Sequence, residues 1–378
     1  WKEEKNNNIQ TKDNLDKLRS EFFTLINKLI SIGQNSNLGM CVDAGKIFII
    51  KREWNSLIPA ALGLHNNMFF HEYISRARDI TLNDFSNENY INQSMITSKL
   101  DGIRKYIFIF KGNVYEIYPP LDIRCIGTSN VPMAILDTEM VDSQYYPFDI
   151  LVLNGEVLLK LPFNERHKRL CFTMKHIQHP QIKMLDFVDG TAYTGPTNIN
   201  KGIYFTDLIS KCLLLNESKN IPNDGLIIQP LSAPYRNHPP MNLKWKPADQ
   251  LNMDFHMTSS PDLSNEYDLY YFEMNTLKKF SGTDLYPYTK TVYFENGMFN
   301  HSLVEGTVIE FCYSYGNFIP LRIRRDKTRP NGKITIFNLW NLIQNPVSKK
   351  TITGKNNKAA VTILRNELFK YLLKKYKK

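Results

Sequence analysis

Short runs of β-branched and aromatic residues, separated by turn residues, recur through most of this 378-residue chain. Such runs are typical of strands in antiparallel sheets. The strands expected before residue 246 are 46–51, 106–110, 114–118, 147–153 and 226–229. Those expected after residue 254 are 269–272, 291–294, 307–313 and 318–323, with turns at Asn296-Gly297 and Asn317. This second group indicates a small antiparallel barrel or sandwich.

Helical spacing is confined to a few segments. Apolar residues between Leu15 and Leu29 recur every three or four positions before Gly33, which predicts a helix over 14–32. Further helices are expected over 164–176, 206–215 and 360–378. The organisation we expect is an N-terminal helical extension (1–38), a first domain (39–253), a second domain (254–345) and a basic C-terminal helix or linker (346–378).

Composition limits the class of protein. Hydrophobic residues make up 42% of the chain, and no stretch approaches the roughly 18 apolar residues of a membrane span, so no membrane partner is expected. The five cysteines are scattered without a C-x-x-C pair, which argues against a zinc site or disulfides and fits a reducing compartment. The chain opens with Trp1, which suggests a fragment of a longer protein.

The basic charge is unevenly placed. The net charge is +10, but residues 349–378 contain ten Lys or Arg and one acid. The rest of the chain is therefore nearly neutral, and the charge does not indicate a general nucleic-acid binder.

The chemistry centres on the segment Lys99-Leu100-Asp101-Gly102-Ile103-Arg104, which precedes an expected strand. Alone, this K-x-D-G-x-R match is weak, because a surface lysine before a turn is common. Five further segments follow it in order: Leu-Asp-Thr-Glu-Met at 136–140, Tyr-Tyr-Pro-Phe-Asp-Ile-Leu at 145–151, Asp-Gly-Leu-Ile-Ile at 224–228, Leu-Lys-Trp-Lys at 243–246 and Arg-Arg-Asp-Lys-Thr-Arg-Pro-Asn at 324–331.

This ordered series resembles the covalent nucleotidyltransferase superfamily, which contains capping enzymes and polynucleotide ligases. Two segments resemble mRNA guanylyltransferases more than ligases: Lys-Trp-Lys at 244–246, and the R-x-D-K-x-x-P-N pattern at 324–331. The sequence looks like the guanylyltransferase part of a viral multifunctional capping enzyme. The resemblance implies an α+β fold, with an antiparallel-sheet nucleotidyltransferase domain followed by an OB-fold barrel.

Two positions depart from the family pattern. Thr138 stands where the family usually has Gly, and Asp224 stands where many members have Glu. Thr suits a strand, and the shorter Asp side chain retains a carboxylate for a metal, so we expect both changes to be tolerated.

The resemblance implies that Lys99 attacks the α-phosphorus of GTP and passes GMP to the 5′-diphosphate end of RNA. An unperturbed lysine has a pKa of about 10.4, so a nucleophilic lysine needs neighbouring cations or desolvation to lower it. Lys244, Lys246 and Arg104 would supply such cations if the motifs converge, and would also neutralise phosphate oxygens.

The acidic residues of the motifs suit a nucleotide and its metal. The resemblance places Glu139 at the ribose and Asp224 at a divalent ion, with Asp149 assisting through the pocket wall or a metal-bound water; Mg²⁺ or Mn²⁺ is implied. The plain alternative is that these acids only pair with nearby lysines.

Other residues receive nucleotide-binding roles from the resemblance. Phe148 would stack on the base, with a core role as the alternative, and Lys183 would read guanine O6 or be an ordinary surface lysine. The second domain would present Arg324, Asp326 and Lys327 to the β- and γ-phosphates, with an exposed basic strand end as the alternative. Asp254 would orient a pocket lysine or close the fifth motif.

The function expected is therefore an mRNA guanylyltransferase with GTP and 5′-diphosphate RNA as substrates. An ATP-dependent RNA or DNA ligase and a non-catalytic RNA-binding scaffold are the alternatives. Flanking RNA triphosphatase or cap methyltransferase domains, and a cytoplasmic or virion-associated location, are expected from the viral resemblance alone.

Overall fold

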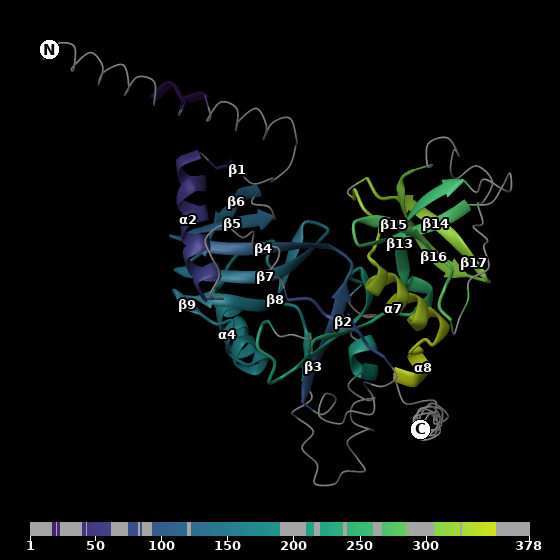
Figure 1. Ribbon diagram of the computed structural model, residues 1–378. Helices are drawn as coiled ribbons and strands as arrows, with labels where there is room; N and C mark the ends of the chain where they lie inside the picture. The colour runs from purple at the N-terminus through teal and green to yellow at the C-terminus, as the bar shows by residue number, and fades with distance from the viewer. Residues whose placement is uncertain are drawn as a thin grey trace, which may run out of the picture.

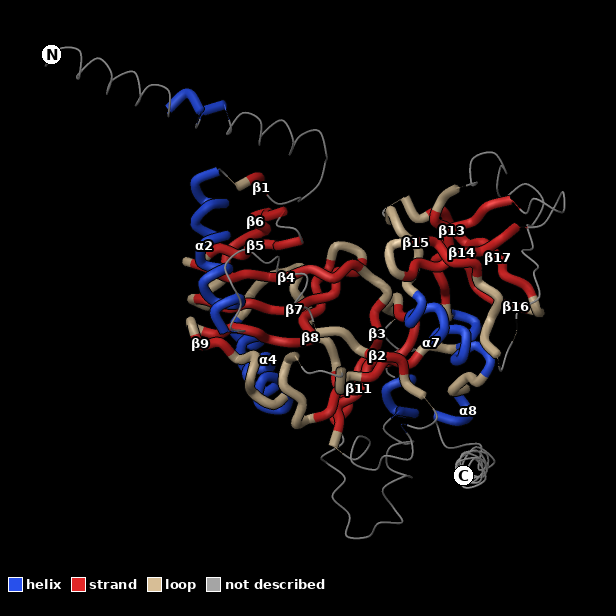
Figure 2. The backbone as a smooth tube through the Cα atoms, viewed as in Figure 1, coloured by secondary structure: helices blue, strands red, loops and turns tan. Residues whose placement is uncertain are grey.

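The computed structural model describes residues 17–19, 21–22, 40–42, 44–61, 75–81, 84, 93–118, 122–189, 209–214, 220–236, 240–259, 267–284, 287, 306–325 and 327–352. These residues form three sheets with helices packed against them (Figures 1 and 2). A membrane span needs about 20 apolar residues, and no helix within the described ranges meets that need in length and hydropathy.

The first sheet is antiparallel throughout and has the order β1-β6-β5-β4-β7-β8-β9. Its strands are β1 (Met40–Cys41), β4 (Ile103–Phe110), β5 (Asn113–Tyr118), β6 (Asp122–Thr128), β7 (Met133–Val141), β8 (Gln144–Leu153) and β9 (Glu156–Val157). Two-residue turns with positive φ at both positions, such as Asp142-Ser143, join neighbouring strands. Such turns match the right-handed twist of paired strands and fix their register.

Helices cover both faces of this sheet. Successive side chains of a strand point to opposite faces; Tyr106 and Phe108 of β4 pack with Trp54 of α2 (Ala44–Ala61). Ile107 and Ile109 point to the other face and pack in the cluster that contains Leu170 of α4 (Phe163–His176). Because both faces are covered, β4 is an almost continuous apolar run.

The second sheet has the order β10-β3-β11-β12-β2 and lies between the other two sheets in Figures 1 and 2. Its strands are β2 (Arg78–Asp79), β3 (Ser94–Leu100), β10 (Phe187–Asp189), β11 (Asn223–Pro230) and β12 (Leu243–Trp245). All pairs are antiparallel except β12 with β2, which is parallel. Helical residues 209–214 contribute to the same core through Ile209 and Cys212.

The third sheet is antiparallel, with the order β15-β14-β13-β16-β17. Its strands are β13 (Asn252–Ser259), β14 (Tyr267–Glu273), β15 (Thr276–Lys279), β16 (Val308–Ser314) and β17 (Asn317–Ile323). Helix α7 (Lys333–Gln344) places Trp340 among the core phenylalanines. Along the chain, the short element η4 (Ala248–Gln250) precedes β13, and α8 (Lys349–Ile352) follows α7. Within the described residues no pairing joins β15 to β17, so the sheet is not a closed barrel.

Most sequence predictions of structure are confirmed, including the α+β class with antiparallel sheets. The strands expected at 106–110, 114–118, 147–153, 226–229, 269–272, 307–313 and 318–323 and the helix at 164–176 are present with small shifts of their ends. The strand predicted over 46–51 is wrong, because these residues begin α2. The strand predicted over 291–294 and the helix over 360–378 lie outside the described residues, as does most of the helix over 14–32.

Candidate active site

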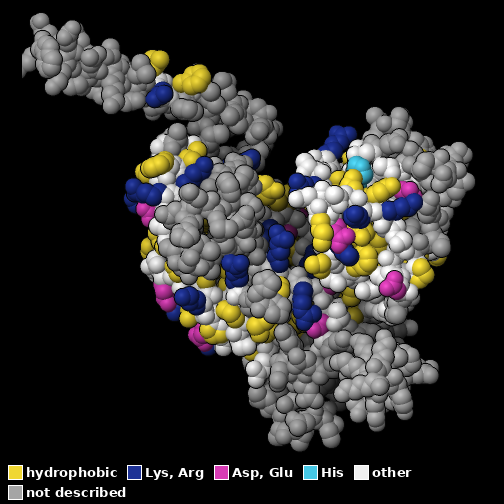
Figure 3. Space-filling view, viewed as in Figure 1, with side chains coloured by type: hydrophobic (Ala, Val, Ile, Leu, Met, Phe, Trp, Pro, Cys, Tyr) yellow, Lys and Arg dark blue, Asp and Glu magenta, His cyan; other side chains and the backbone are white. Residues whose placement is uncertain are grey.

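A cavity of about 320 Å³ lies over the second sheet, where the ends of β4, β7 and β8 meet it. Six predicted site residues line it together: Lys99, Arg104, Glu139, Phe148, Asp149 and Lys244. This volume is within the usual range for small-molecule sites. Figure 3 shows Lys and Arg side chains gathered on the face that borders the hollow between the two parts of the molecule.

Two of the predicted lysines share one carboxylate. Nζ of Lys99, on β3, lies 2.6 Å from Oδ1 of Asp224, and Nζ of Lys246 contacts Oδ2 of the same side chain. The pairing of Lys99 with Gly225 across β3 and β11 brings these residues together. Three motifs that lie far apart in the sequence therefore converge at one point.

Gly225 makes this convergence possible. A Cβ atom added to it would lie 1.9 Å from the carbonyl oxygen of Trp245, so no side chain fits between β11 and the backbone that leads to Lys246. Gly102 is similarly confined, since its Cβ would lie 2.4 Å from the carbonyl oxygen of Met140. The glycines of both D-G segments thus allow close approach of backbones.

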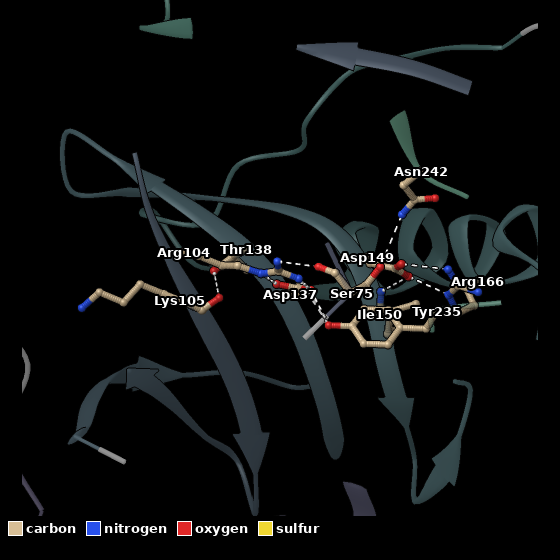
Figure 4. A network of polar contacts seen from close by, with 10 residues as sticks. All are labelled: Ser75, Arg104, Lys105, Asp137, Thr138, Asp149, Ile150, Arg166, Tyr235 and Asn242. Carbon is tan, nitrogen blue, oxygen red and sulfur yellow. Dashed lines mark hydrogen bonds and ion pairs between the residues drawn. The ribbon is translucent and has the colours of Figure 1, made fainter. Parts of the chain in front are cut away.

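Arg104 is held in a buried network rather than against Lys99 (Figure 4). Its Nε donates to Oδ1 of Asp137 at 2.9 Å, and its Nη1 donates to the carbonyl of Ser75 at 2.8 Å. The hydroxyl of Tyr235 donates to Oδ2 of the same aspartate at 2.7 Å. The guanidinium carbon lies 5.2 Å from the ring centre of Phe148, so the network fixes one wall of the cavity.

The structure gives Asp149 another partner than the predicted metal. This side chain is only 2% exposed. Its two oxygens accept hydrogen bonds from Nε and Nη2 of Arg166, both at 2.9 Å (Figure 4). Oδ1 also accepts from the amide of Ile150 at 2.8 Å. With both oxygens bound, Asp149 lines the cavity as the counter-ion of a buried arginine.

Glu139 and Lys244 both line the cavity. Burial raises the pKa of the Glu139 carboxyl to about 7, although Arg104 and Lys99 counteract part of this effect. Nζ of Lys244 lies 3.4 Å from Asp79 on the neighbouring strand β2. The cavity therefore offers an acid that titrates near neutral pH and a partly exposed ammonium group.

The last motif converges on Asp254 of β13, which is 4% exposed. Nη1 of Arg324 donates to its Oδ1 at 2.9 Å, Lys327 contacts its Oδ2, and Asn331 donates to Oδ2 at 3.3 Å. Within the described residues the side-chain contacts of Asp254 are with the last motif, so the lysine that it orients is Lys327. Asp326 lies outside the described residues.

Comparison with known proteins assigns the family. The family model described as "mRNA capping enzyme, catalytic domain" matches residues 79–248, and the model described as "mRNA capping enzyme, C-terminal domain" matches residues 250–353. The chain belongs to the mRNA capping enzyme family. It is 23% identical to a "Probable mRNA-capping enzyme" of Acanthamoeba polyphaga mimivirus, over 84% of this chain and 36% of that protein.

The viral relatives are longer than this chain. The "mRNA-capping enzyme" of African swine fever virus is 27% identical over 45% of this chain and 19% of its own length. The chain thus spans about a third of the mimivirus protein and a fifth of the African swine fever virus enzyme.

Among solved structures, the ligase domain of M. tuberculosis LigD is similar with a TM-score of 0.32 and 12% identity, covering 67% of this chain and 94% of that domain. A mycobacterial DNA ligase D complexed with ATP and MES has a TM-score of 0.36 and 13% identity over the same shares. TM-scores and identities this low assign no function to this member of the capping enzyme family.

A divalent ion of the kind that the family implies fits the carboxylates at this site. Among the described residues no three His, Cys, Asp or Glu side chains gather closely enough to hold a metal by themselves. Mg²⁺, however, is commonly held by one or two carboxylates together with substrate phosphates. Asp224, beside Lys99, is the residue placed to do this.

The position of Lys183 does not support its predicted role. It follows Ile182, which forms a bridge with Tyr145, and its side chain is exposed and absent from the cavity lining. Thr138 fits at the position where the family usually has Gly. It is buried in β7, and its hydroxyl donates to the carbonyl of Lys105 at 2.8 Å.

Sequence reasoning missed seven polar residues of the cavity wall. These are Ser75, Arg76, Thr97, Ser98, Gln229, Tyr235 and Asn242. None lies within the quoted motif segments; Ser98 directly precedes the segment at 99–104 and Gln229 directly follows the one at 224–228, and this was the only available signal.

Proposed function

We propose that this chain carries the guanylyltransferase activity of an mRNA capping enzyme, with Lys99 as the nucleophile. The observation that supports this most directly is the contact of Lys99, which lines the cavity, and of Lys246 with the two oxygens of Asp224. A lysine beside a second cation and a carboxylate suits attack on a phosphate ester, because phosphoryl-type transfer depends mainly on positioning and charge.

The first step joins Nζ of Lys99 to the α-phosphorus of GTP. The bond between that phosphorus and the bridging oxygen breaks, pyrophosphate leaves, and the amine loses its protons. Lys246 lies near enough to Lys99 to contact an α-phosphate oxygen once phosphate replaces Asp224 as its partner. In the second step the terminal phosphate of a 5′-diphosphate RNA displaces Lys99 and forms the 5′–5′ linkage.

A bound Mg²⁺ or Mn²⁺ would neutralise phosphate oxygens, with Asp224 as its protein ligand. Glu139 would then accept hydrogen bonds from the ribose, and Phe148, fixed by Arg104, would pack against the base. The role of Asp149 in this proposal is to hold Arg166 and the wall behind the nucleotide, not to bind the ion.

The second domain is proposed to be an OB-type barrel that presents Arg324 and Lys327 to the departing phosphates. The five-stranded antiparallel sheet supports a barrel of this type, and Asp254 would hold both basic side chains in place for the purpose. Asp326 keeps its predicted role within this motif. The domain boundaries at residues 38, 253 and 345 belong to the same proposal.

The partial overlap with longer viral capping enzymes supports two wider proposals. Triphosphatase or methyltransferase activities would flank this segment in the same polypeptide, since it spans only part of the relatives. A cytoplasmic or virion-associated location rests on the viral relatives alone.

The proposal is tested by incubating the chain with α-labelled GTP or α-labelled ATP and a divalent ion, followed by a denaturing gel. Wild type should retain label from GTP, and Lys99→Ala should not. Lys183→Ala is a matched control, because that lysine is exposed and outside the cavity, and it should label normally. Label from ATP alone would assign the chain to the ligase type instead, and label from neither would favour a non-catalytic scaffold.

A further inference from the structure

The amide of Gln229 carries a buried hydrogen-bond acceptor without a partner. The side chain is 3% exposed, and its Oε1 accepts no hydrogen bond within the described residues. Gln229 also lines the cavity that contains Lys99. A buried polar atom that lacks a partner costs free energy, so such an atom in a binding cavity points to a ligand that supplies the missing donor.

Gln229 lies farther along the same pair of strands that carries Lys99. On β11, Gly225 pairs with Lys99 of β3, while Gln229 pairs with Met95. Four residues of strand separate the two positions, or about 13 Å. Because the α-phosphorus becomes bonded to Lys99, the ribose and base must extend away from it, and Gln229 lies in one of the directions open to them.

Several side chains of the cavity lining provide surface for a base without reading its edge. Phe148, Leu185 and Ile227 line the cavity and offer apolar surface for the flat faces of a base, without hydrogen bonds. Thr97 already donates its hydroxyl hydrogen to the carbonyl of Asp186 at 2.6 Å.

We propose that Oε1 of Gln229 accepts hydrogen bonds from the N1–H and 2-amino groups of guanine and so selects GTP over ATP. This inference rests on the proposed guanylyltransferase function. Guanine presents two donors on this edge, whereas adenine presents a ring acceptor and a C–H group. A site that hydrogen-bonds its substrate discriminates strongly against an analogue that lacks the group, because the buried acceptor is then left unpaired.

The test compares the efficiency of lysyl-nucleotide formation with GTP, ITP and ATP. ITP lacks the 2-amino group. Gln229→Ala should lower the efficiency with GTP by about ten- to hundredfold, leave ATP nearly unchanged, and no longer distinguish GTP from ITP. Gln229→Glu should retain the preference for GTP, because a carboxylate also accepts both hydrogen bonds.

Gln144 provides a matched control. Its Oε1 is also buried and unpartnered within the described residues, but it lies at the start of β8, outside the cavity lining. Gln144→Ala should leave the ratio of GTP to ATP efficiency unchanged. Gln229→Met should melt no lower than wild type, because Oε1 of Gln229 accepts no hydrogen bond within the described residues.

Three results would overturn the inference. Equal loss with GTP and ATP in Gln229→Ala, or a lowered melting temperature in Gln229→Met, would show that the amide only supports the wall of the cavity. An unchanged preference for GTP in Gln229→Ala would show that another group reads the base. Failure of wild type to form any lysyl-nucleotide is a different result, which overturns the proposed function and this inference with it.

Discussion

Replacing Gly225 with alanine should misalign the catalytic lysines. The added Cβ would lie 1.9 Å from the carbonyl oxygen of Trp245, whereas real Cβ contacts stay beyond 3.0 Å, so the backbones must separate by more than 1 Å. The φ angle of +155° also disfavours a side chain. Overpacking and backbone strain of this kind each cost about 1–3 kcal/mol, so we expect the free energy of unfolding to fall by about 2–6 kcal/mol.

The effect on activity should exceed the effect on folding. Asp224 precedes Gly225 and Lys246 follows Trp245, so the forced separation moves these two residues relative to each other. A displacement of about 1 Å at a reacting centre can reduce the rate by about a hundredfold. Lysyl-GMP formation should be measured below the melting transition of the variant.

Gly332→Ala is the matched control. The Cβ of that residue would meet only the carbonyl of Phe272 at 3.7 Å, an ordinary contact. If Gly225→Ala formed lysyl-GMP at the wild-type rate while folded, the close approach of β11 to the segment carrying Lys246 would not be what assembles the site.

Three further predictions concern the acidic residues. Asp254→Asn should slow lysyl-GMP formation at least tenfold by loosening Arg324, but should leave transfer from preformed lysyl-GMP to RNA unchanged; equal loss in both steps would contradict this. The pKa of Glu139 is about 7, against an ordinary 4.5, so the folded state binds this proton more tightly than the unfolded state. The free energy of unfolding therefore falls as pH rises from about 4.5 to 7, and Glu139→Gln should be more stable than wild type at pH 8 by on the order of 3 kcal/mol. Denaturant titration should find this difference absent at pH 4.5. Asp149→Asn should melt at a lower temperature without raising the Mg²⁺ concentration needed for half-maximal labelling, whereas Asp224→Asn should raise it; the reverse pattern would restore Asp149 as a metal ligand.

The convergence of the chemistry could be predicted from the sequence because it depends on backbone pairing. The strand expected at 226–229, beside Asp224, and the ordered motifs predicted residues that the register of β3 and β11 does bring together, although β3 was not among the expected strands. The same reasoning could not give the partners of individual acids. Asp149 pairs with Arg166 from a helix 17 positions later, and no spacing rule links a strand residue to a helix in that way.

Local ambiguity explains the errors in secondary structure. The run Lys46-Ile47-Phe48-Ile49-Ile50-Lys51 is as compatible with a strand as with a helix over six residues. The structure resolves it as a helix, because Ile47, Ile50, Trp54 and Leu57 continue at helical spacing and pack on the first sheet. Helix α7 escaped prediction because its β-branched and aromatic residues resemble those of the preceding strands.

The central claim is that GMP bonded to Lys99 is the intermediate of cap formation. The most direct measurement labels the chain with α-labelled GTP, removes the free nucleotide, maps the adduct by peptide mass spectrometry, and then adds 5′-diphosphate RNA. The account predicts GMP on Lys99 alone, followed by movement of the label to the RNA in a phosphatase-resistant 5′–5′ linkage. An adduct on another residue, or label that stays on the protein when RNA is added, would contradict it.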